Sequence, residues 1–484
     1  MSFYHGVKVS EYVSSVAAPS ITSCGIPFVV GAAPVQTVGG KANIPILCKT
    51  YAEATAALGY SDEWTNYPLC EVMYSHFKLY GMSPVIFLNV LDPATMKSPV
   101  AAAEKVLANK QVKLPIETIA SSVVVKTTGG TGAALVKGTD YSLLYCGENL
   151  IIEVLPGGTA YSATAINVAY DAVTPTAVTA TQIIGGYDTG TQKTTGLECI
   201  NQSLAMFGVV PDLILAPGMS HNSTVAAAMA AKAAGINGIF TAKALIDVDC
   251  STTGADFYSE VEAWKTANSI TDKNQILCWP MVQLDGKTFH LSTHLAGLIA
   301  KTDNGNGCPY ESPSNKPLEI DAIVTDGGNG NFNDVILDIT AANVLNADGV
   351  VTALNMLSGF TLWGNYTAAY PKSAEPKDTF ICVSRMFSYV DTQLVKKLWS
   401  KIDRPMTRLL VDSIVDDANY WLIGLVSDGK LYGGRVEFLA SENSIESLTS
   451  GKITLHIYLA SPFPGQMIEF IREYDSSYVK TALA

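Results

Sequence analysis

The sequence is poor in charged residues and in histidine, and it contains no long uninterrupted apolar run. Only 15% of its 484 residues are charged, and 44 acidic residues outnumber 31 basic ones, which gives a net charge of −13. Nucleic-acid binding needs clustered Lys and Arg to neutralise phosphates, so this balance argues against a nucleic-acid partner. The most apolar stretch, 225–246, is interrupted by Lys232 and Lys243. We therefore expect a buried helix and strand there, with no membrane insertion.

Paired cysteines are also missing. The nine cysteines are scattered, with no Cys-x-x-Cys pair, which predicts free thiols in a reducing compartment and neither a disulfide framework nor a zinc site. The first residues lack the basic and apolar regions of a secretory signal. We expect the chain to stay in the cytoplasm of the cell that makes it.

What is present predicts a multidomain protein that combines α/β and α+β parts. Residues 21–92 and 191–358 alternate short apolar strands with helices, which predicts one α/β core domain. Between them, 93–190 is rich in Thr, Val and Gly–Gly turns, which predicts an inserted all-β domain. Residues 359–484 predict an α+β C-terminal domain. Residues 1–20 have too few apolar side chains to bury themselves, and composition alone predicts that they fray as an ordinary terminus.

Short strands with one apolar face are predicted at both ends of the chain. Near the N-terminus, Val7 and Val9 alternate with polar residues. Near the C-terminus two strands are predicted, the first with Ile453, Leu455, Ile457 and Leu459 on one face and the second with Ile468, Phe470 and Tyr474.

Ser220 lies where an enzyme nucleophile would stand. It falls between a predicted strand, 213–216, and a predicted helix, 223–234, as in the α/β hydrolases. However, Asn222 replaces the second glycine of the Gly-x-Ser-x-Gly motif. Capping of the helix by Ser220, Asn222 and Ser223 explains the pattern more simply. We expect no catalytic residue, and a hydrolase or peptidase using Ser220 is the alternative.

Other motif-like patterns each lack a required residue. His290 and His294 have the spacing of a helical metal site, but Leu291 stands where the metalloprotease motif needs Glu. The loop 326–334 has glycines where a calcium loop needs oxygen ligands. The segment 424–431 resembles a phosphate-binding loop, yet it ends in leucine where a hydroxyl must hold Mg²⁺. We expect no metal and no cofactor.

Five motifs in one order carry a resemblance to a known family. They are His294-Leu-Ala-Gly-Leu-Ile-Ala-Lys-Thr-Asp303, Ser312-Pro-Ser-Asn315, Gly359-Phe-Thr-Leu-Trp-Gly-Asn-Tyr-Thr367, Arg385-Met-Phe387 and Pro462-Phe-Pro-Gly-Gln-Met-Ile-Glu-Phe470. In this order the sequence resembles contractile tail sheath proteins of bacteriophages and phage-derived injection machines. The match is good from about residue 196 to 478, fair for 1–90 and poor for the predicted insertion.

One position departs from the family pattern. The family has two adjacent arginines before the Phe-x-Tyr-Val step, and here Ser384 precedes the single Arg385. A salt bridge or an interface contact that the missing arginine would make is therefore in doubt.

The resemblance implies a structural protein and no enzyme. Sheath subunits have an α/β core with a subtilisin-like shape, and they polymerise as stacked hexameric rings around an inner tube. The sleeve contracts and drives the tube through a target cell envelope. The implied partners are further copies, the inner tail tube protein, and baseplate and tail terminator proteins. The implied place is a virion tail or particle sheath that is assembled in the bacterial host cytoplasm.

In the family an extended N-terminal arm, here residues 1–20, and a terminal arm of the C-terminal sheath domain, here residues 359–484, pair with neighbouring subunits. Exposed strand edges are a liability in a monomer, but in a polymer they link neighbours by β-augmentation. The resemblance therefore implies a subunit interface that includes Val7, Val9, Ile453, Leu455, Ile457, Ile468 and Phe470.

Two further interpretations concern binding surfaces. The predicted helix 391–401 carries Lys396, Lys397 and Lys401, which would suit an acidic tube surface or form a solvated helix face. A cell-surface-binding module in the inserted β domain is the second alternative function.

Overall fold

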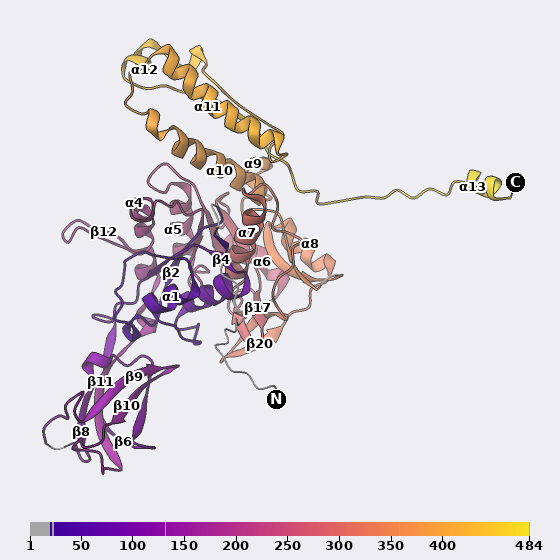
Figure 1. Ribbon diagram of the computed structural model, residues 1–484. Helices are drawn as coiled ribbons and strands as arrows, with labels where there is room; N and C mark the ends of the chain where they lie inside the picture. The colour runs from indigo at the N-terminus through magenta and orange to yellow at the C-terminus, as the bar shows by residue number, and fades with distance from the viewer. Residues whose placement is uncertain (1–19, 22–23, 131, 358, 484) are drawn as a thin grey trace, which may run out of the picture.

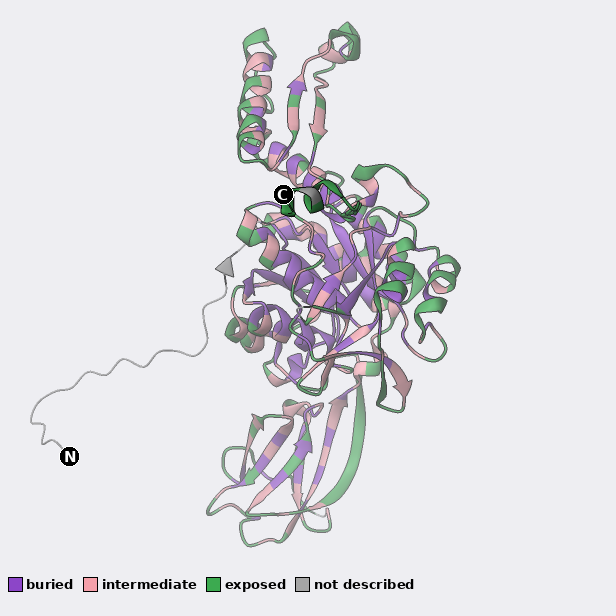
Figure 2. Cartoon of the chain, turned by 90° about the vertical axis from the view of Figure 1, so that its right-hand side faces the viewer, coloured by how far each residue is buried: buried purple, intermediate pink, exposed green. Residues whose placement is uncertain are grey.

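The centre of the molecule is one mostly parallel sheet of eight strands (Figures 1 and 2). The computed structural model describes residues 20–21, 24–130, 132–357 and 359–483. The strand order is β22-β21-β16-β15-β14-β2-β5-β3; the strands from β21 to β5 are parallel, and β22 and β3 are antiparallel to their neighbours. The bounds are β2 Pro27–Gly31, β3 Ile46–Cys48, β5 Val85–Asn89, β14 Leu213–Leu215, β15 Lys243–Asp247, β16 Gln275–Cys278, β21 Val350–Asn355 and β22 Phe360–Trp363.

The inner strands are buried on both faces because helices cover the sheet. Every residue of β2, β5, β14, β15 and β16 is buried, as expected for central parallel strands. The covering elements are α1 Tyr51–Leu58, α2 Pro68–Val72, the π-helix Met73–Leu79, α4 Ser203–Phe207, α5 Ser223–Ala234, α6 Val261–Ala267, α7 Leu291–Asn306 and α8 Ile339–Ala347. Figure 2 shows this buried centre in purple.

Two smaller sheets flank this core. Antiparallel pairing joins four strands in the order β18-β17-β19-β20, with bounds Lys287–Phe289, Met281–Leu284, Ala322–Gly328 and Asn331–Asp334. At the start of the described chain, β1 (Ser20–Ile21) pairs in parallel with β4 (Met82–Ser83).

The described residues of 97–173, which leave out 131, contain no α-helix and pack around their own apolar cluster. Two three-stranded sheets, β7-β10-β9 and β6-β11-β8, face each other at one end of the molecule (Figure 1). Their strands are β6 Lys97–Val106, β7 Gln111–Pro115, β8 Val124–Thr127, β9 Tyr141–Cys146, β10 Asn149–Val154 and β11 Ala165–Val173. After β11, α3 (Ala180–Ile184) returns to the core, where Ile183 is fully buried, and the hairpin of β12 (Gly186–Asp188) and β13 (Lys193–Thr195) follows.

A helical arm projects from the opposite end of the molecule (Figure 1). A third apolar cluster holds it together, with Met386, Leu422 and Val436 among its members. The arm is built from α9 Pro376–Thr379, α10 Ile381–Leu398, α11 Arg408–Ser427, β23 Gly433–Glu437, α12 Ile445–Thr449 and β24 His456–Ala460, and α13 Ser477–Ala482 follows at the end of an extended tail. The predicted domain boundaries at 92/93, 190/191 and 358/359 stay predictions. No helix among the described residues is long and apolar enough to span a membrane.

The predicted second C-terminal strand is wrong for the single chain. Residues 461–476 are described and form no helix or strand. Ile468 and Phe470 are 79% and 89% exposed. A strand needs a partner for its backbone donors and acceptors, and the described part of this subunit supplies none.

Two helical glycines differ in the space around them, and this difference gives a stability prediction. A Cβ on Gly297 of α7 would lie 2.3 Å from Cδ2 of Tyr80, whereas one on Gly424 of α11 would meet nothing within 4 Å. We expect Gly297→Ala to lower the free energy of unfolding by about 1–3 kcal/mol through overpacking. Gly424→Ala should raise it by up to about 1 kcal/mol. Chemical denaturation measures both, and equal effects would contradict the packing of α7 against Tyr80.

Candidate functional site

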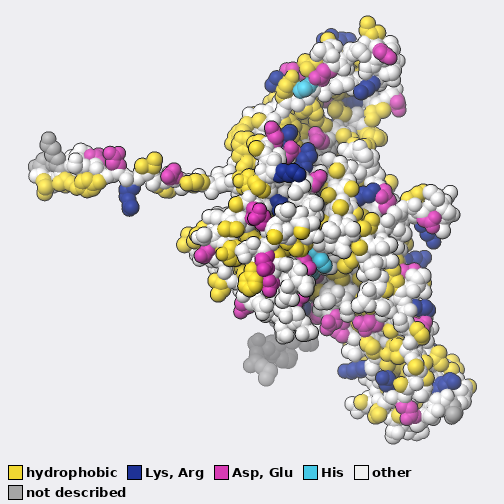
Figure 3. All heavy atoms as spheres, turned by 180° about the vertical axis from the view of Figure 1, so that it is seen from behind, with side chains coloured by type: hydrophobic (Ala, Val, Ile, Leu, Met, Phe, Trp, Pro, Cys, Tyr) yellow, Lys and Arg dark blue, Asp and Glu magenta, His cyan; other side chains and the backbone are white. Residues whose placement is uncertain are grey.

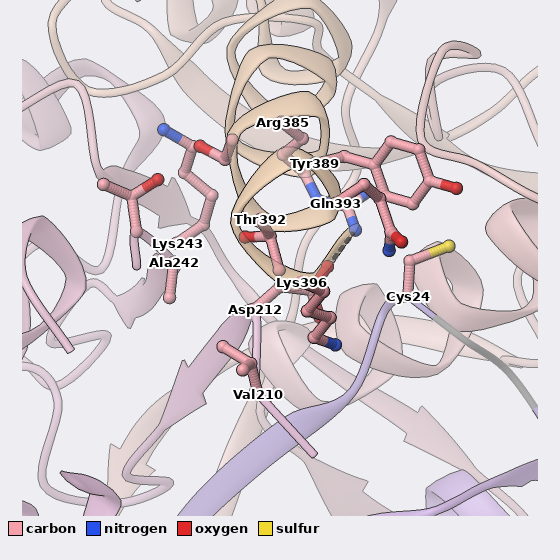
Figure 4. Close-up of a pocket in the computed structure, with 12 residues that line it drawn as sticks. Cys24, Val210, Asp212, Ala242, Lys243, Arg385, Tyr389, Thr392, Gln393 and Lys396 are labelled. Carbon is pink, nitrogen blue, oxygen red and sulfur yellow. Dashed lines mark hydrogen bonds and ion pairs between the residues drawn. The ribbon is translucent and has the colours of Figure 1, made fainter. Parts of the chain in front are cut away.

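The joint between α10 and the α/β core is built around the guanidinium group of Arg385 (Figure 4). Its Nη1 donates to Oδ1 of Asp303 at 3.1 Å, and its Nη2 donates both to Oδ2 of Asp303 and to Oδ2 of Asp212, the latter at 2.9 Å. The side chains of Arg385 and Asp303 are 3% and 1% exposed. One arginine therefore binds two carboxylates, one buried (Asp303) and one partly exposed (Asp212).

The three charged groups come from three separate parts of the chain. Arg385 lies near the start of α10, Asp303 near the end of α7, and Asp212 just before β14. The carboxylate of Asp212 also accepts the backbone N–H groups of Gly25 at 2.9 Å and Ile26 at 2.6 Å. Asp212 thus links α10 of the helical arm to Gly25 and Ile26, the residues that directly precede β2.

Burial and charge oppose each other in this cluster. Burial alone would lower the pKa of Arg385, but the adjacent Asp303 and Asp212 carboxylates outweigh it and raise that pKa. Burial raises the pKa of Asp303 to about 6, and Arg385 acts against this shift. Moving an ion out of water costs several kcal/mol, so the cluster is stable only while all its members are present.

A second buried cation lies beside this cluster. Lys243 begins β15 and is 1% exposed. Its Nζ donates to Oγ of Ser384 at 2.7 Å, to Oδ1 of Asn274 at 2.9 Å and to the carbonyl oxygen of Lys273 at 3.1 Å. No carboxylate among the described residues pairs with it, and burial lowers its pKa to about 7. Ser384 of α10 stands where the sheath resemblance leads one to expect a second arginine. Its Oγ instead accepts a hydrogen bond from Lys243 of β15.

The three lysines predicted to face a tube all contact their own subunit. Lys396 lines the small cavity of about 30 Å³ between α10 and the core, and burial lowers its pKa (Figure 4). Lys397 lies 5.6 Å from the ring centre of Trp421, and Lys401 pairs with Asp417 at 2.9 Å. The tube contact stays a prediction.

Five of the seven predicted interface residues lie within the described residues, all of them near the C-terminus. Val7 and Val9 lie outside the described residues. Ile453 and Leu455 precede β24, and Ile457 lies within it and is 37% exposed. Ile468 and Phe470, placed above in the exposed tail, complete the set. Their role as an interface stays a prediction.

Ser220 is held in a structural hydrogen-bond network. It is 1% exposed, and its Oγ donates to Oδ2 of Asp247 at 3.0 Å while accepting the Asp247 N–H at 3.0 Å. Ser292 donates to the same carboxylate, from its Oγ at 2.6 Å and its N–H at 3.0 Å. Among the described residues, no histidine forms a hydrogen bond with Oγ of Ser220. The predicted capping is confirmed for Asn222, whose side chain accepts the first N–H groups of α5.

The two spaced histidines face different partners. Nδ1 of His290 lies 2.8 Å from Oε2 of Glu71; burial acts to lower its pKa, and this carboxylate raises it to about 9. His294 is fully buried against Tyr80, and burial lowers its pKa to about 3. No group of three metal-ligating side chains occurs in the described ranges. The two imidazoles are thus held by different partners, Glu71 and Tyr80.

Similarity to curated proteins extends along the whole chain. No family model matches the sequence. The chain is 28% identical over 491 residues to a tail sheath protein of Burkholderia phage BcepMu, and 99% of this chain and 98% of that protein are covered. It is also 28% identical over 303 residues to a tail sheath protein of Escherichia phage P2, with 61% and 70% covered.

Solved structures share the fold. The chain matches a chain of the anti-feeding prophage baseplate with a TM-score of 0.56 and 13% identity, covering 98% of this chain and 100% of that one. It matches the PVC sheath complex of an extracellular contractile injection system, in the contracted state, with a TM-score of 0.56 and 12% identity, covering 99% of each. The predicted resemblance to contractile tail sheath proteins is confirmed.

The likeness to sheath proteins also covers residues 93–190, where the motifs gave little support, because the alignment with the Burkholderia phage protein is nearly full-length. The partners of Arg385 were missed by sequence reasoning. Asp303 belongs to one of the quoted motifs, and Asp212 directly precedes a buried strand. For Asp212, the one local sign of a buried ion pair was its position, as a charged residue, directly before an apolar strand.

The Arg385 cluster predicts a large difference between a buried and an exposed arginine. Arg385→Met leaves Asp303 buried without its counter-charge and should lower the free energy of unfolding by about 3–5 kcal/mol. The control Arg408→Met removes an exposed pair with Asp412 and should change it by less than about 0.5 kcal/mol. Urea denaturation of the unassembled chain measures both. Similar losses for the two variants would contradict the assigned role of Arg385.

The buried Lys243 predicts a pH dependence with a definite sign. Its pKa is about 7 in the folded chain against 10.5 for an ordinary lysine, so between these pH values the unfolded chain binds more protons. The free energy of unfolding of the natural chain, minus that of Lys243→Met, should therefore rise by about 1 kcal/mol per pH unit from pH 7.5 to 9.5. The same difference taken with Lys452→Met, an exposed lysine that does not contribute to the pKa shift of Lys243, should be flat. A flat line for both would contradict the burial of a titrating lysine.

Proposed function

We propose that this chain is the structural subunit of a contractile tail sheath, which polymerises as stacked hexameric rings around an inner tube and contracts to drive the tube through a target cell envelope. The observation that carries the proposal is the near full-length similarity to a phage tail sheath protein. A likeness that spans every part of the chain favours the same role for the whole protein, whereas a shared core alone would not.

Two features of the fold support a rigid body with an added domain. The α/β sheet and its helices form a single core cluster, consistent with the subtilisin-like shape that the family implies. The separate apolar cluster within 97–173 supports an inserted β domain. Glu148 of this region accepts hydrogen bonds from Oγ of Ser61 at 2.6 Å and N of Asp62 at 2.8 Å, which would hold it in one orientation on the core.

A structural role without catalysis also agrees with the buried serine. A nucleophile must reach its substrate and lose a proton to a base, yet Ser220 is buried and bonded to a carboxylate that it shares with Ser292. The network supports the start of α5 and of α7, and this accounts for its residues without an enzyme.

Strand exchange between subunits would link neighbours in the sleeve. The strands β23 and β24 form a two-stranded sheet, so each has one edge without a strand partner in the described chain. The tail carries apolar side chains into solvent (Figure 3). Both features are unfavourable in a monomer and favourable where a neighbour adds a strand. Each added backbone hydrogen bond contributes about 0.5–1.5 kcal/mol, so a few can tether subunits during contraction.

The partners follow from this role. They are further copies of the chain, the inner tail tube protein, and baseplate and tail terminator proteins, and the place is the tail of a virion or a related particle. The helix α10 remains a candidate for the tube contact through Lys396, Lys397 and Lys401.

Removal of residues 1–12 tests the proposal. The segment contains Val7 and Val9 and has too few apolar residues to stabilise its own subunit, so the free energy of unfolding of the unassembled chain should change by less than about 0.5 kcal/mol. Polymerisation into hollow cylinders, seen by negative-stain electron microscopy, should be lost because neighbours are no longer linked.

A matched control changes the polar face of the predicted N-terminal strand and keeps Val7 and Val9. Lys8→Ala with Ser10→Ala alters the opposite face of the predicted strand and should leave assembly intact.

In a chain whose exposed Cys146 is replaced by serine, cysteines at positions 9 and 457 should crosslink between subunits and give ladders on a gel. Crosslinks confined to single chains, or cylinders formed by the truncated protein, would show that the arm does not exchange.

A further inference from the structure

Three of the motifs that carry the family resemblance meet at one open cavity of about 650 Å³. Its lining includes residues from 312–315, from 363–366 and from 462–466, which are far apart in the sequence. The first two belong to the α/β body, and the third is the base of the C-terminal tail. None of these residues belongs to the ion-pair cluster of Arg385, Asp303 and Asp212.

The first two motifs form a fixed platform. The Oγ of Ser314 accepts the N–H of Gly364 at 3.0 Å, and the N–H of Asn315 donates to the carbonyl of Leu362 at 2.6 Å. The Oγ of Ser312 donates to Oδ1 of Asn365. These bonds fasten the loop to the end of β22, and the chain that follows reaches Tyr366 in a defined position.

A row of five aromatic rings crosses from this platform to the tail. The rings of Tyr366 and Tyr370 are stacked with centres 3.9 Å apart, and Phe380 lies 5.0 Å from Tyr366 on the way to α10. Phe463 of the tail base lies 6.2 Å from Phe380 and 6.1 Å from Tyr432, which precedes β23. The row thus contacts the body, the helical arm and the tail base in turn.

Contact between the tail and the body ends three residues beyond this row. The hydroxyl of Tyr366 donates to Oε1 of Gln466 at 2.7 Å. Past Gln466, the described chain makes no hydrogen bond, ion pair or ring contact with the body, and its large apolar side chains are exposed. Figure 1 shows this tail running away from the molecule.

We propose that Phe463 and Gln466 anchor the C-terminal tail and that Tyr366 and Phe463 are positioning residues, which set the direction in which the tail leaves the subunit. The inference rests on the proposed function, in which the tail links neighbouring subunits. Because a cavity lies beneath residues 462–466, few other contacts hold this segment. Its direction therefore depends on one hydrogen bond and on the rings around Phe463. A tail held in one direction meets its neighbour more often than one that samples many directions.

The test measures the direction of the tail in the full-length chain. Spin labels are placed on cysteines introduced by Glu469→Cys, just past the anchor, and Ser427→Cys, at the end of α11, with Cys146→Ser in the background. The labelled chain is diluted with unlabelled chain and kept below the concentration of assembly. We expect one narrow distance distribution, at least twofold wider in Tyr366→Phe and wider still in Phe463→Ala.

A control variant and a second measurement complete the design. Tyr432→Phe removes a hydroxyl that has no hydrogen-bond partner among the described residues and keeps its ring against Phe463, so it should leave the distribution unchanged. Phe463→Tyr should restore most of the narrow distribution. All variants should keep the melting temperature of the natural chain, while the fraction assembled falls at least twofold in Tyr366→Phe and Phe463→Ala.

Two outcomes would overturn the inference, and neither depends on sheath assembly. One is an unchanged distance distribution in both Tyr366→Phe and Phe463→Ala. The other is equal broadening in Tyr432→Phe, which would show a general loosening of the arm. Failure of the natural chain to form cylinders would instead count against the proposed function, while the distance measurement would still decide whether the anchor exists.

Discussion

The bond between Arg385 and its two carboxylates is the constraint on which the arrangement of the molecule depends. Apolar surfaces can slide against each other at small cost, but a bidentate arginine pair permits one relative placement of its partners. Because the cluster is buried, a shift that separated the charges would leave them unpaired in a medium of low dielectric constant. The joint between the helical arm and the core is therefore rigid, and movement in an assembly must occur elsewhere.

The aromatic row lies near the same end of α10 and complements the charge cluster. Phe380 directly precedes α10, and Arg385 follows within its first turns. The start of this helix is thus fixed twice, once by ring contacts and once by ion pairs. Its last turns still contact the core through Val395 and Lys396, whereas α11 projects away from the core (Figure 1). Interfaces between rigid bodies tend to switch between discrete arrangements. A body fixed in this way, joined to its neighbours by extended segments, suits a polymer that changes length.

The sequence predicted local structure well where the signal was local. The helix 223–234 matches α5, and the strand 213–216 corresponds to β14, because apolar periodicity and the Asn222 cap act over a few residues. The buried strand expected within 225–246 begins only at Lys243, where β15 starts, and Ile236 to Phe240 before it is a turn. Lys243 makes the start of this strand look polar in the sequence. The side chains that satisfy its ammonium group in the core, Asn274 and Ser384, lie far along the chain and give no local signal.

Long-range pairings could not be read from one sequence. Asp212 and Arg385 are 173 positions apart, and nothing in their spacing indicates contact. The prediction of a second C-terminal strand was wrong for a different physical reason. The apolar alternation of Ile468 and Phe470 indicates a strand, but a strand forms only beside a partner, and the described part of this chain offers it none. The apolar alternation is thus compatible with a strand only where another chain supplies the pairing edge.

The likeness of Ser220 to a nucleophile has its origin in the fold. In a parallel sheet the carboxyl ends of neighbouring strands meet at one edge, where β14 and β15 bring Ser220 and Asp247 together. Enzymes of this class leave such a serine open to substrate and pair it with a base. Here the carboxylate of Asp247 is occupied by Ser220 and by Ser292 at the start of α7, so the edge serves to fasten two helices to the sheet. The same geometry that supports catalysis in other proteins thus gives this subunit part of the rigidity that a mechanical role requires.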